Sequence, residues 1–403
     1  MDIPDKILAL LTDFYSYENR QGRKIVRCVV TGNEYPDWHH LDDNHKNNDP
    51  GNIIPLDPGL NKYLGGQKVG GKEILEELFP FNLRPTYLCR LAEQLAEEWK
   101  FGRAIGCLRL AFYLSRPPYV KKDNSFRLKV ACMPIRHLRH HVYFQILETT
   151  LLDIFKVLSD MDSAQIETVI NLKYDLVALL NEHGLFECAS DCAKNLEDSM
   201  NQHIIKRFPV DKIGSIKRRI YQVALLDRNN FSLQRLLGEL EEMSERNLKL
   251  KTSLSNTNVL RALARKDKKE IADCYEKISA LCRKFAPEIE KFRKPGVGPS
   301  DLAEIFLYKA ILALFVKPRK YNMIVEDSFA KSKYLFHDCH ALITFQYPDF
   351  WEEVFKLLAI GLNSSHPLAQ FVVKHYRTPL SNRIVEYAET IFKRINTMVV
   401  IPE

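Results

Sequence analysis

The spacing of apolar residues changes near residue 72, and the two parts of the chain predict different structures. Residues 5–17 carry apolar side chains three and four positions apart, which predicts a helix. Ile25–Val30 and Asn52–Leu56 are short runs rich in β-branched or apolar residues, which predict strands. Asp37–Leu41 is expected to be extended. The first part of the chain therefore predicts a small module of mixed structure.

A short helix is expected directly after the second of these strands. Asp57 can cap its first turn, Pro58 suits the first helical position, and Gly65-Gly66 is expected to end it. Asn61 then lies on the first turns of this helix. Asp42–Gly51, which precedes the second strand, is rich in Asn and Asp and predicts a loop. The predicted order is strand, strand, helix.

From about residue 72 onward the pattern predicts one helix after another, as expected for an all-helical domain. The candidate helices are 72–79, 85–116, 142–160, 163–183, 186–206, 213–227, 231–248, 257–285, 300–316, 322–345, 349–362 and 380–397. Two stretches, which begin at Leu88 and at Leu176, have the spacing of tetratricopeptide helix pairs. A generic helical hairpin explains them equally well.

The predicted fold class is therefore mainly α, with two domains. A small N-terminal domain covers residues 1–75, and a large all-helical, partly tetratricopeptide-like domain covers 76–403. The Pro- and Gly-rich stretch at 294–300 predicts a subdivision of the helical part.

Composition is typical of a soluble globular protein, with 46% hydrophobic and 27% charged residues among 403. No apolar run approaches the roughly 18 residues of a membrane span, and the first residues lack a secretory signal pattern. Nine cysteines occur without a C-x-x-C spacing, which suits a reducing compartment. We therefore expect a cytoplasmic protein with no membrane partner.

The formal net charge is +7, and it is unevenly placed. Residues 1–75 hold 9 Lys/Arg and 11 Asp/Glu, so the excess of positive charge lies in the helical part. The candidate nucleic-acid-binding residues there are Lys121, Lys122, Arg136 and Arg139. Charged residues on helices also form ordinary solvated surfaces, and this alternative stays open.

Four residues of the N-terminal part form the densest polar constellation of the chain. His40 is suited to act as a general base, because an imidazole titrates near neutral pH. His39 offers a nitrogen ligand and Asn61 a neutral oxygen ligand, which suit one Mg²⁺ or Mn²⁺ ion. Asn52 is placed to orient His40 and to tie the loop. Adjacent residues of a regular strand face opposite sides, so a twist or bulge is needed for both histidines to reach one site.

This constellation resembles the HNH, or ββα-metal, nuclease family over residues 25–70. His39 resembles the family's first metal ligand, His40 the base, Asn52 the central asparagine and Asn61 the closing ligand. The resemblance implies a metal-dependent endonuclease. In the alternative interpretation, these four side chains satisfy buried backbone groups of a loop-rich domain.

A zinc site is not expected beside this constellation. Cys28-Val-Val-Thr-Gly32 resembles the turn in which many HNH proteins carry a zinc-binding C-x-x-C, but Thr31 stands at the second cysteine position. Asp42, Asp43 and His45 could be auxiliary metal ligands, although solvated loop residues are the more common interpretation of such a stretch.

The sequence thus predicts an HNH-type enzyme that hydrolyses DNA phosphodiester bonds with one divalent ion. The helical domain is expected to regulate the enzyme and to bind nucleic acid, a partner protein or a second copy of the chain. The layout resembles effector nucleases of antiviral defence. Two alternatives remain: a non-catalytic helical-repeat scaffold with a degenerate HNH module, and an RNA-cleaving HNH enzyme.

Overall fold

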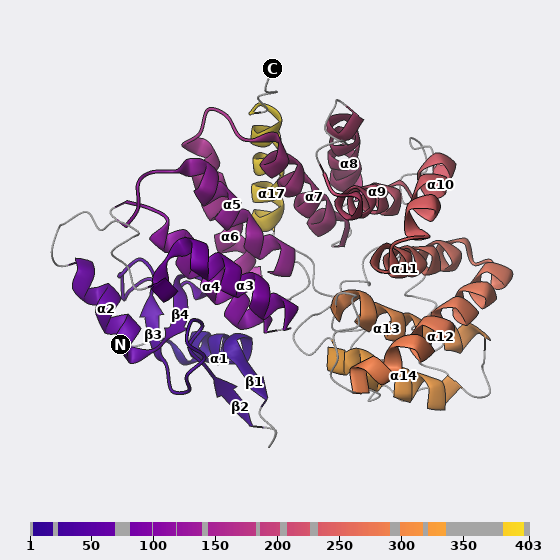
Figure 1. Ribbon diagram of the computed structural model, residues 1–403, viewed down its shortest axis with the longest axis horizontal. Helices are drawn as coiled ribbons and strands as arrows, with labels where there is room; N and C mark the ends of the chain where they lie inside the picture. Colours follow the sequence, from indigo (N-terminus) through magenta and orange to yellow (C-terminus); the bar gives the residue numbers. More distant parts are fainter. Residues whose placement is uncertain are drawn as a thin grey trace. The chain divides into compact units, whose positions relative to one another are not determined.

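The computed structural model divides the chain into two compact units, which are described separately (Figure 1). Unit 1 combines Met1–Leu172 with Ser381–Glu403, and unit 2 is Lys173–Leu380. The expected boundary at residue 75 falls inside unit 1, and the expected subdivision at 294–300 falls inside unit 2. The structure describes residues 3–18, 23–68, 81–98, 100–117, 119–138, 144–182, 186–201, 208–225, 233–290, 299–316, 321–335 and 382–398.

Unit 1 holds all the strands of the described residues together with a set of helices, so the expected mainly α fold is confirmed. Its elements are α1 (Asp5–Tyr15), β1 (Ser16–Glu18), β2 (Lys24–Val26), β3 (Asp37–His40), η1 (Pro50–Asn52), β4 (Ile53–Leu56), α2 (Pro58–Lys68), η3 (Phe81–Leu83), α3 (Pro85–Glu97), α4 (Phe101–Leu114), α5 (Asn124–Leu138), α6 (Phe144–Ser159) and α17 (Asn382–Asn396). The unit boundary lies within α7 (Ile166–Glu182).

Unit 2 is a succession of helices in which, from α8 onward, each contacts the next. These helices are α8 (Phe186–Asn201), α9 (Val210–Ala224), α10 (Leu233–Ser244), α11 (Leu248–Arg265), α12 (Lys268–Glu290), α13 (Pro299–Val316) and α14 (Tyr321–Leu335). Helix α11 also contacts α9 and α13. None of the helices described in either unit is long and apolar enough to cross a membrane.

Two of the long helices expected from the sequence are in fact pairs. The predicted helix 85–116 is interrupted between Glu97 and Phe101. The predicted helix 257–285 is interrupted between Arg265, where α11 ends, and Lys268, where α12 begins. Lys266 has a left-handed backbone (φ 55°) that ends α11. Apolar periodicity continues across such breaks because both helices bury residues in the same core. The predicted helices 72–79 and 349–362 lie outside the described residues.

The short elements of the N-terminal part differ from expectation at their ends. The start of α2 is as predicted, because the Gly59 N–H donates to Asp57 Oδ1 at 2.9 Å. The helix continues through Gly65 to Lys68 instead of ending there. The predicted strand Ile25–Val30 is a strand only as far as Val26, and Arg27 adds an isolated bridge to Glu34. The chain then turns, and the Gly32 N–H donates back to the Cys28 carbonyl (3.0 Å).

Helix α4 lies at the centre of unit 1, where it contacts α1, α3, α5 and β4. It is apolar on nearly all sides, as expected of a helix enclosed by other elements. Gly106 permits its close approach to the Cys28–Gly32 turn, since a Cβ there would lie 2.4 Å from the Val29 side chain. The Cys107 thiol donates to the Val29 carbonyl at 3.1 Å. The turn is therefore held by a helix that follows it by some 70 residues.

One buried charge on α4 joins three elements of unit 1. The Arg109 side chain is 8% exposed and forms an ion pair with Asp153 of α6, with Nη1 and Oδ2 2.5 Å apart. Its Nε donates to the carbonyl oxygen of Gly51 in η1 at 2.8 Å. Arg109 therefore connects α4, α6 and the segment that leads into β4.

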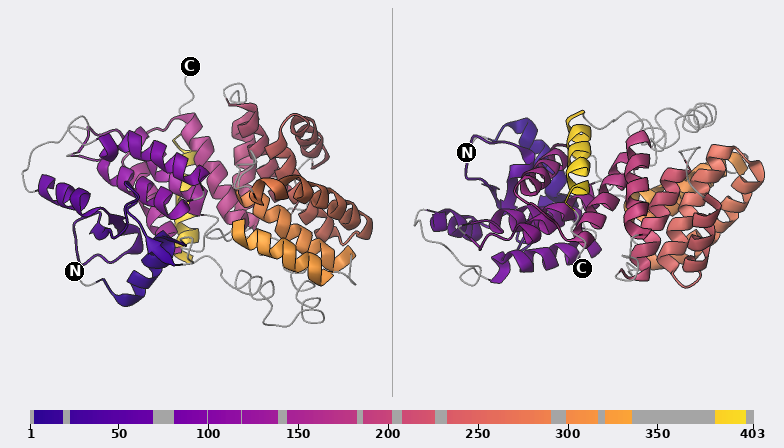
Figure 2. Two further views of the ribbon diagram at one scale, coloured as in Figure 1. Left: turned by 60° about the horizontal axis from the view of Figure 1, so that its bottom comes forward. Right: turned by 90° about the horizontal axis from the view of Figure 1, so that it is seen from above.

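Helix α17 returns to unit 1 from the far end of the chain and packs on α6 (Figure 2). Arg394 donates to the Met161 carbonyl at 2.8 Å, and Ala164 N–H donates to the Met398 carbonyl at 3.1 Å. Arg383 and Glu148 form an ion pair at 3.0 Å. The C-terminal helix is thus an integral part of unit 1.

We expect Arg109→Met to lower the free energy of unfolding by about 3–5 kcal/mol, because it leaves the Asp153 carboxylate buried without its partner. The control is Lys100→Met in the same unit, which removes an ion pair to Glu98 between side chains 50% and 32% exposed. Its expected cost is under about 1 kcal/mol. Urea denaturation followed by circular dichroism measures both, and equal costs for the two variants would contradict this account.

Candidate active site

The strand–strand–helix order predicted around the two histidines is present as β3, β4 and α2. Strands β3 and β4 are antiparallel, and His40 pairs with Ile53. The Leu41 N–H donates to the Asn52 carbonyl at 2.8 Å, which extends the pairing by one residue. The loop 42–49 therefore leaves and returns at neighbouring positions, with His40 at one end and Asn52 at the other.

His39 and Asn61, the two predicted metal ligands, are in direct contact. His39 Nδ1 lies 2.8 Å from Asn61 Oδ1, and the His39 side chain is buried. Asn61 Nδ2 in turn donates to Asp37 Oδ2 at 3.5 Å. One imidazole, one amide and one carboxylate therefore meet between β3 and the first turns of α2.

The spacing of these atoms fits a shared divalent cation. Two ligands at about 2.1 Å from one ion and at right angles to each other lie about 3 Å apart, close to the 2.8 Å between His39 and Asn61. Among the described residues there is no cluster of three or more His, Cys, Asp or Glu side chains that could hold a metal. An ion here would depend on water and substrate oxygens for its remaining ligands, as Mg²⁺ commonly does.

His40, the predicted base, faces the loop 42–49. Its side chain is 1% exposed, and Nε2 lies 3.2 Å from Asn48 Oδ1. Its ring packs edge-on against His45, with centroids 5.2 Å apart. Nδ1 is buried and has no hydrogen-bond partner within the described part of the chain. His40 thus carries one ring nitrogen that is held by an amide and one whose hydrogen-bonding capacity is unused within the described residues.

The two histidines have different neighbours. His39 contacts α2, whereas His40 contacts the loop, as expected for adjacent residues of a regular strand. Because β3 and β4 pair in continuous register, no bulge turns both rings to the same side. A substrate that uses both residues would have to reach across the end of β3.

Asn52 ties the loop together as predicted, but none of its hydrogen bonds within the described residues reaches the His40 ring, which it was also predicted to orient. Its Nδ2 donates to Asp42 Oδ1 (2.7 Å) and to the Asn47 carbonyl (3.1 Å), and its Oδ1 accepts from the Asp42 N–H (3.1 Å). These bonds go to the loop. The bond that orients the His40 ring comes from Asn48.

Asp42 is the charged centre of this loop. Burial raises the pKa of its carboxyl, but hydrogen bonds from Asn47, Asn52 and the Asn44 N–H outweigh burial and leave the pKa below its ordinary value. His40 lowers the pKa further. The charged form of Asp42 is therefore the form that holds the loop together.

We expect Asp42→Asn to destabilise the protein at pH 6 and to have little effect near pH 2. A carboxyl whose pKa is lowered by folding contributes stability above its unfolded value of about 3.9, and this contribution is lost as pH falls through the folded value. Urea unfolding of both proteins across this range measures the difference. A difference that does not change with pH would contradict the assignment.

Helix α6 holds the other end of the loop. Thr149 donates from Oγ1 to Asp49 Oδ1 at 2.7 Å, and the same carboxylate oxygen accepts from the Gly51 N–H at 2.7 Å. Gly51 is so close to α6 that a Cβ there would lie 2.6 Å from the Thr149 side chain. Together with Arg109, these contacts fix η1 and hence the position of Asn52.

We expect Gly51→Ala to lower the free energy of unfolding by about 1–3 kcal/mol, because the new methyl group forces Thr149 or η1 to shift. Gly65→Ala is the matched control: a Cβ there has no atom within 4 Å, and alanine in a helix interior is favoured over glycine by roughly 0.5–1 kcal/mol. Chemical denaturation gives both values. An unchanged free energy of unfolding in the Gly51→Ala variant would show that the contact between Gly51 and α6 is loose.

Sequence reasoning missed two residues of this site. Asp37 lies two positions before His39 on β3 and so shares its side of the strand, a period-two signal that the sequence does contain. Asn48 was placed only within a polar loop, and no spacing rule identifies which loop residue contacts His40.

The residues predicted to bind nucleic acid lie outside the hairpin. Lys121 and Lys122 are exposed between α4 and α5, and Arg136 is exposed on α5. Arg139 lies outside the described residues. In the Cys28–Gly32 turn, which resembles the zinc-binding turn of HNH proteins, the Thr31 N–H donates to the Cys28 sulfur at 3.4 Å. Thr31 therefore contributes its backbone to this turn.

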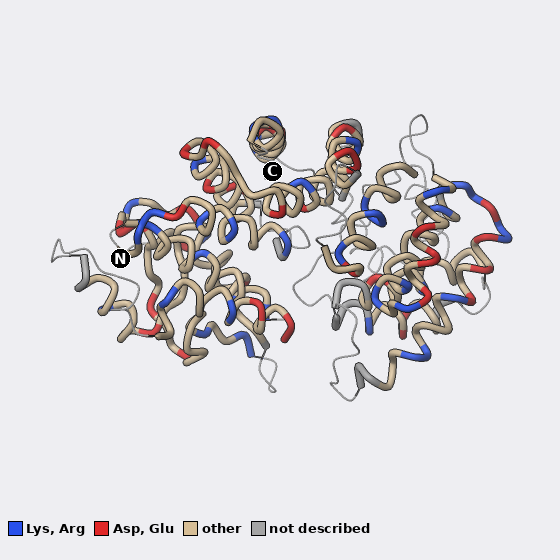
Figure 3. Tube along the Cα trace, turned by 45° about the horizontal axis from the view of Figure 1, so that its top comes forward, with Lys and Arg blue, Asp and Glu red and all other residues tan. Residues whose placement is uncertain are grey.

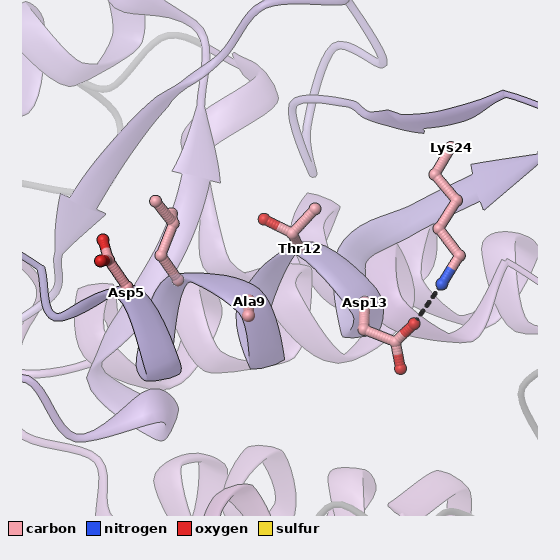
Figure 4. Close-up of a pocket in the computed structure, with 6 residues that line it drawn as sticks. Asp5, Ala9, Thr12, Asp13 and Lys24 are labelled. Atoms are coloured by element: carbon pink, nitrogen blue, oxygen red, sulfur yellow. Dashed lines mark hydrogen bonds and ion pairs between the residues drawn. The ribbon is translucent and has the colours of Figure 1, made fainter.

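A shallow pocket of unit 1 lies elsewhere, along α1 and at the start of β2 (Figure 4). Asp5, Leu8, Ala9, Thr12, Asp13 and Lys24 line it. Its charged pair, Asp13 and Lys24, is satisfied internally. No histidine lines it, and we assign no chemistry to it.

No protein-family model matches this chain, and no curated protein and no solved structure matches it either.

Proposed function

We propose that this protein is a metal-dependent endonuclease of HNH type that hydrolyses DNA phosphodiester bonds. The observation that carries the proposal is the contact between His39 Nδ1 and Asn61 Oδ1, 2.8 Å apart between β3 and α2. Two residues 22 positions apart, proposed as ligands of one ion, meet at a spacing that one ion can use. The next residue of the same strand is His40, a buried histidine whose Nδ1 has no hydrogen-bond partner among the described residues.

Each residue has a defined role in this proposal. His39 and Asn61 hold one Mg²⁺ or Mn²⁺ ion, which when bound would stabilise charge on phosphate and leaving-group oxygens. His40 accepts a proton from the attacking water at Nδ1, while Asn48 holds Nε2. Asn52 fixes the loop that carries Asn48. Asp37 adds a carboxylate beside the ligands and favours a cation there.

The helices of unit 2 suit a regulatory or docking role. Consecutive helices pack on one another, and α11 also contacts α9 and α13, as in tetratricopeptide-like repeats that bind partner proteins. We propose that a protein partner or a second copy of the chain binds there. A nuclease joined to such a scaffold suits a cytoplasmic effector of antiviral defence, an analogy of layout.

We expect purified protein to nick supercoiled plasmid with Mg²⁺ or Mn²⁺, and His40→Ala to reduce the rate by about 10²–10⁴-fold, the usual contribution of a general base. His39→Ala and Asn61→Ala should raise the metal concentration needed for half-maximal rate. His45→Ala, which changes the exposed neighbour of His40, is the control and should retain most activity.

Three outcomes of this experiment distinguish the alternatives. Cleavage that survives His40→Ala would remove His40 from the mechanism. Preferential cleavage of a matched RNA would favour an RNA-cleaving HNH enzyme. A lack of cleavage of either nucleic acid with either metal, even when a binding partner is added, would favour the non-catalytic scaffold.

A further inference from the structure

Beside the candidate site lies a group of cations that are not neutralised by carboxylates. Three of them, Arg116, Lys121 and Lys122, lie in the connection that follows α4, and Arg127 lies in the first turn of α5. Among the described residues none of these four has an ion-pair partner, although other cations of unit 1, such as Lys24 and Lys100, have one. We name these four residues the α4–α5 basic surface.

Aromatic rings hold the two arginines of this surface. The Arg116 guanidinium carbon lies 4.1 Å from the Tyr113 ring centroid, and that of Arg127 lies 5.4 Å from the Phe112 ring centroid. A guanidinium stacked on a ring is oriented while its charge remains available to an anion.

The two arginines also affect each other unfavourably. Burial lowers the pKa of Arg127, and the neighbouring Arg116 cation lowers it further. Arg127 Nε is buried and lacks a hydrogen-bond partner in the part of the chain that the structure describes. A bound anion would relieve the repulsion between the two cations.

The nearby carboxylates are engaged elsewhere or lie beyond ion-pair distance. Asp153 is paired with Arg109, and Asp123 accepts from the Phe126 N–H at 3.0 Å. Asp160 and Asp153 act on Arg127 only as charges beyond ion-pair distance. They offset part of the positive charge, but within the described residues they form no ion pair with the four cations.

A short chain of contacts connects this surface to His40. The Asp43 N–H donates to the His40 carbonyl at 3.1 Å, and the Tyr113 hydroxyl donates to Asp43 Oδ2 at 3.5 Å. Tyr113 is the residue on which Arg116 stacks. The surface is thus adjacent to the turn that follows the proposed base.

Elsewhere along the helices of both units, Lys and Arg are interspersed with Asp and Glu (Figure 3). In unit 2, for example, Lys217 and Arg235 are both paired with Glu239. The α4–α5 basic surface differs from these because its cations lie beside the proposed phosphodiester site and have no ion-pair partner in the part of the chain that the structure describes.

We propose that Arg116, Lys121, Lys122 and Arg127 bind the phosphate backbone of duplex DNA and place one strand beside His40. The proposal rests on the proposed nuclease function for its substrate. Binding itself needs neither metal nor cleavage, so it is tested independently of catalysis.

The test is binding of a fluorescein-labelled DNA duplex to the His40→Ala protein in EDTA, followed by anisotropy across a salt series. Each phosphate contact contributes about 0.9 to the slope of log affinity against log salt. We expect Arg116→Gln/Arg127→Gln to make this slope shallower by about 2. Lys24→Gln/Lys100→Gln, which removes two paired lysines, should leave it unchanged.

A charge-preserving variant separates binding from folding. Arg116→Lys/Arg127→Lys keeps both charges and should restore most of the slope, and circular dichroism checks that each variant is folded. Equal slopes for wild type and the glutamine variant, or equal losses in the paired-lysine control, would overturn the proposal. So would stronger binding to matched RNA or to anionic phospholipid vesicles than to the duplex. If the wild-type protein binds DNA in a salt-sensitive way but does not cleave it, the result would support DNA binding by this surface and contradict the proposed nuclease function.

Discussion

The buried guanidinium of Arg109 is the interaction on which the arrangement of unit 1 depends. A charge removed from water has to be paired and hydrogen-bonded, and Arg109 meets this requirement with Asp153 on one side and the Gly51 carbonyl on the other. The first contact joins α4 to α6, and the second joins both helices to η1. Because η1 leads directly into β4, the position of Asn52 follows from the position of Arg109.

This constraint explains why the hairpin is not a separate domain. In isolation, β3, β4 and α2 would offer two short strands and one helix, too little to bury a core of their own. The missing support comes from α4 and α6, and α6 is covered by α17 from the end of the chain. A boundary at residue 75 looks natural in the sequence because the spacing of apolar residues changes there. Helices α4 and α6, which lie beyond residue 75, nevertheless pack against β4 and η1.

The sequence could predict those features of the fold that depend on residues close together in the chain. Pro58 after Asp57 identified the start of α2, and the order of His39, His40, Asn52 and Asn61 identified the strand–strand–helix unit in which His39 meets Asn61. The hydrogen bonds of Arg109 to Asp153 and Gly51, and of Thr149 to Asp49, join residues 44 to 100 positions apart, and no periodicity in the sequence records such pairs. Asn48 was missed for a different reason: irregular loops have no fixed spacing that would place one side chain on a given neighbour.

The contact between His39 and Asn61 also bears on how readily the proposed site could take up an ion. A divalent ion that binds both atoms has to replace one hydrogen bond, which is worth about 1 kcal/mol in net stability. That cost is small, and the bond meanwhile holds the two side chains at a separation an ion can use. The Asp37 carboxylate beside Asn61 adds a charge that favours the cation over the hydrogen bond. In the proposed site the neutral pair would thus be a preformed arrangement of ligands, because its hydrogen bond already holds α2 against β3 at the spacing that an ion can use.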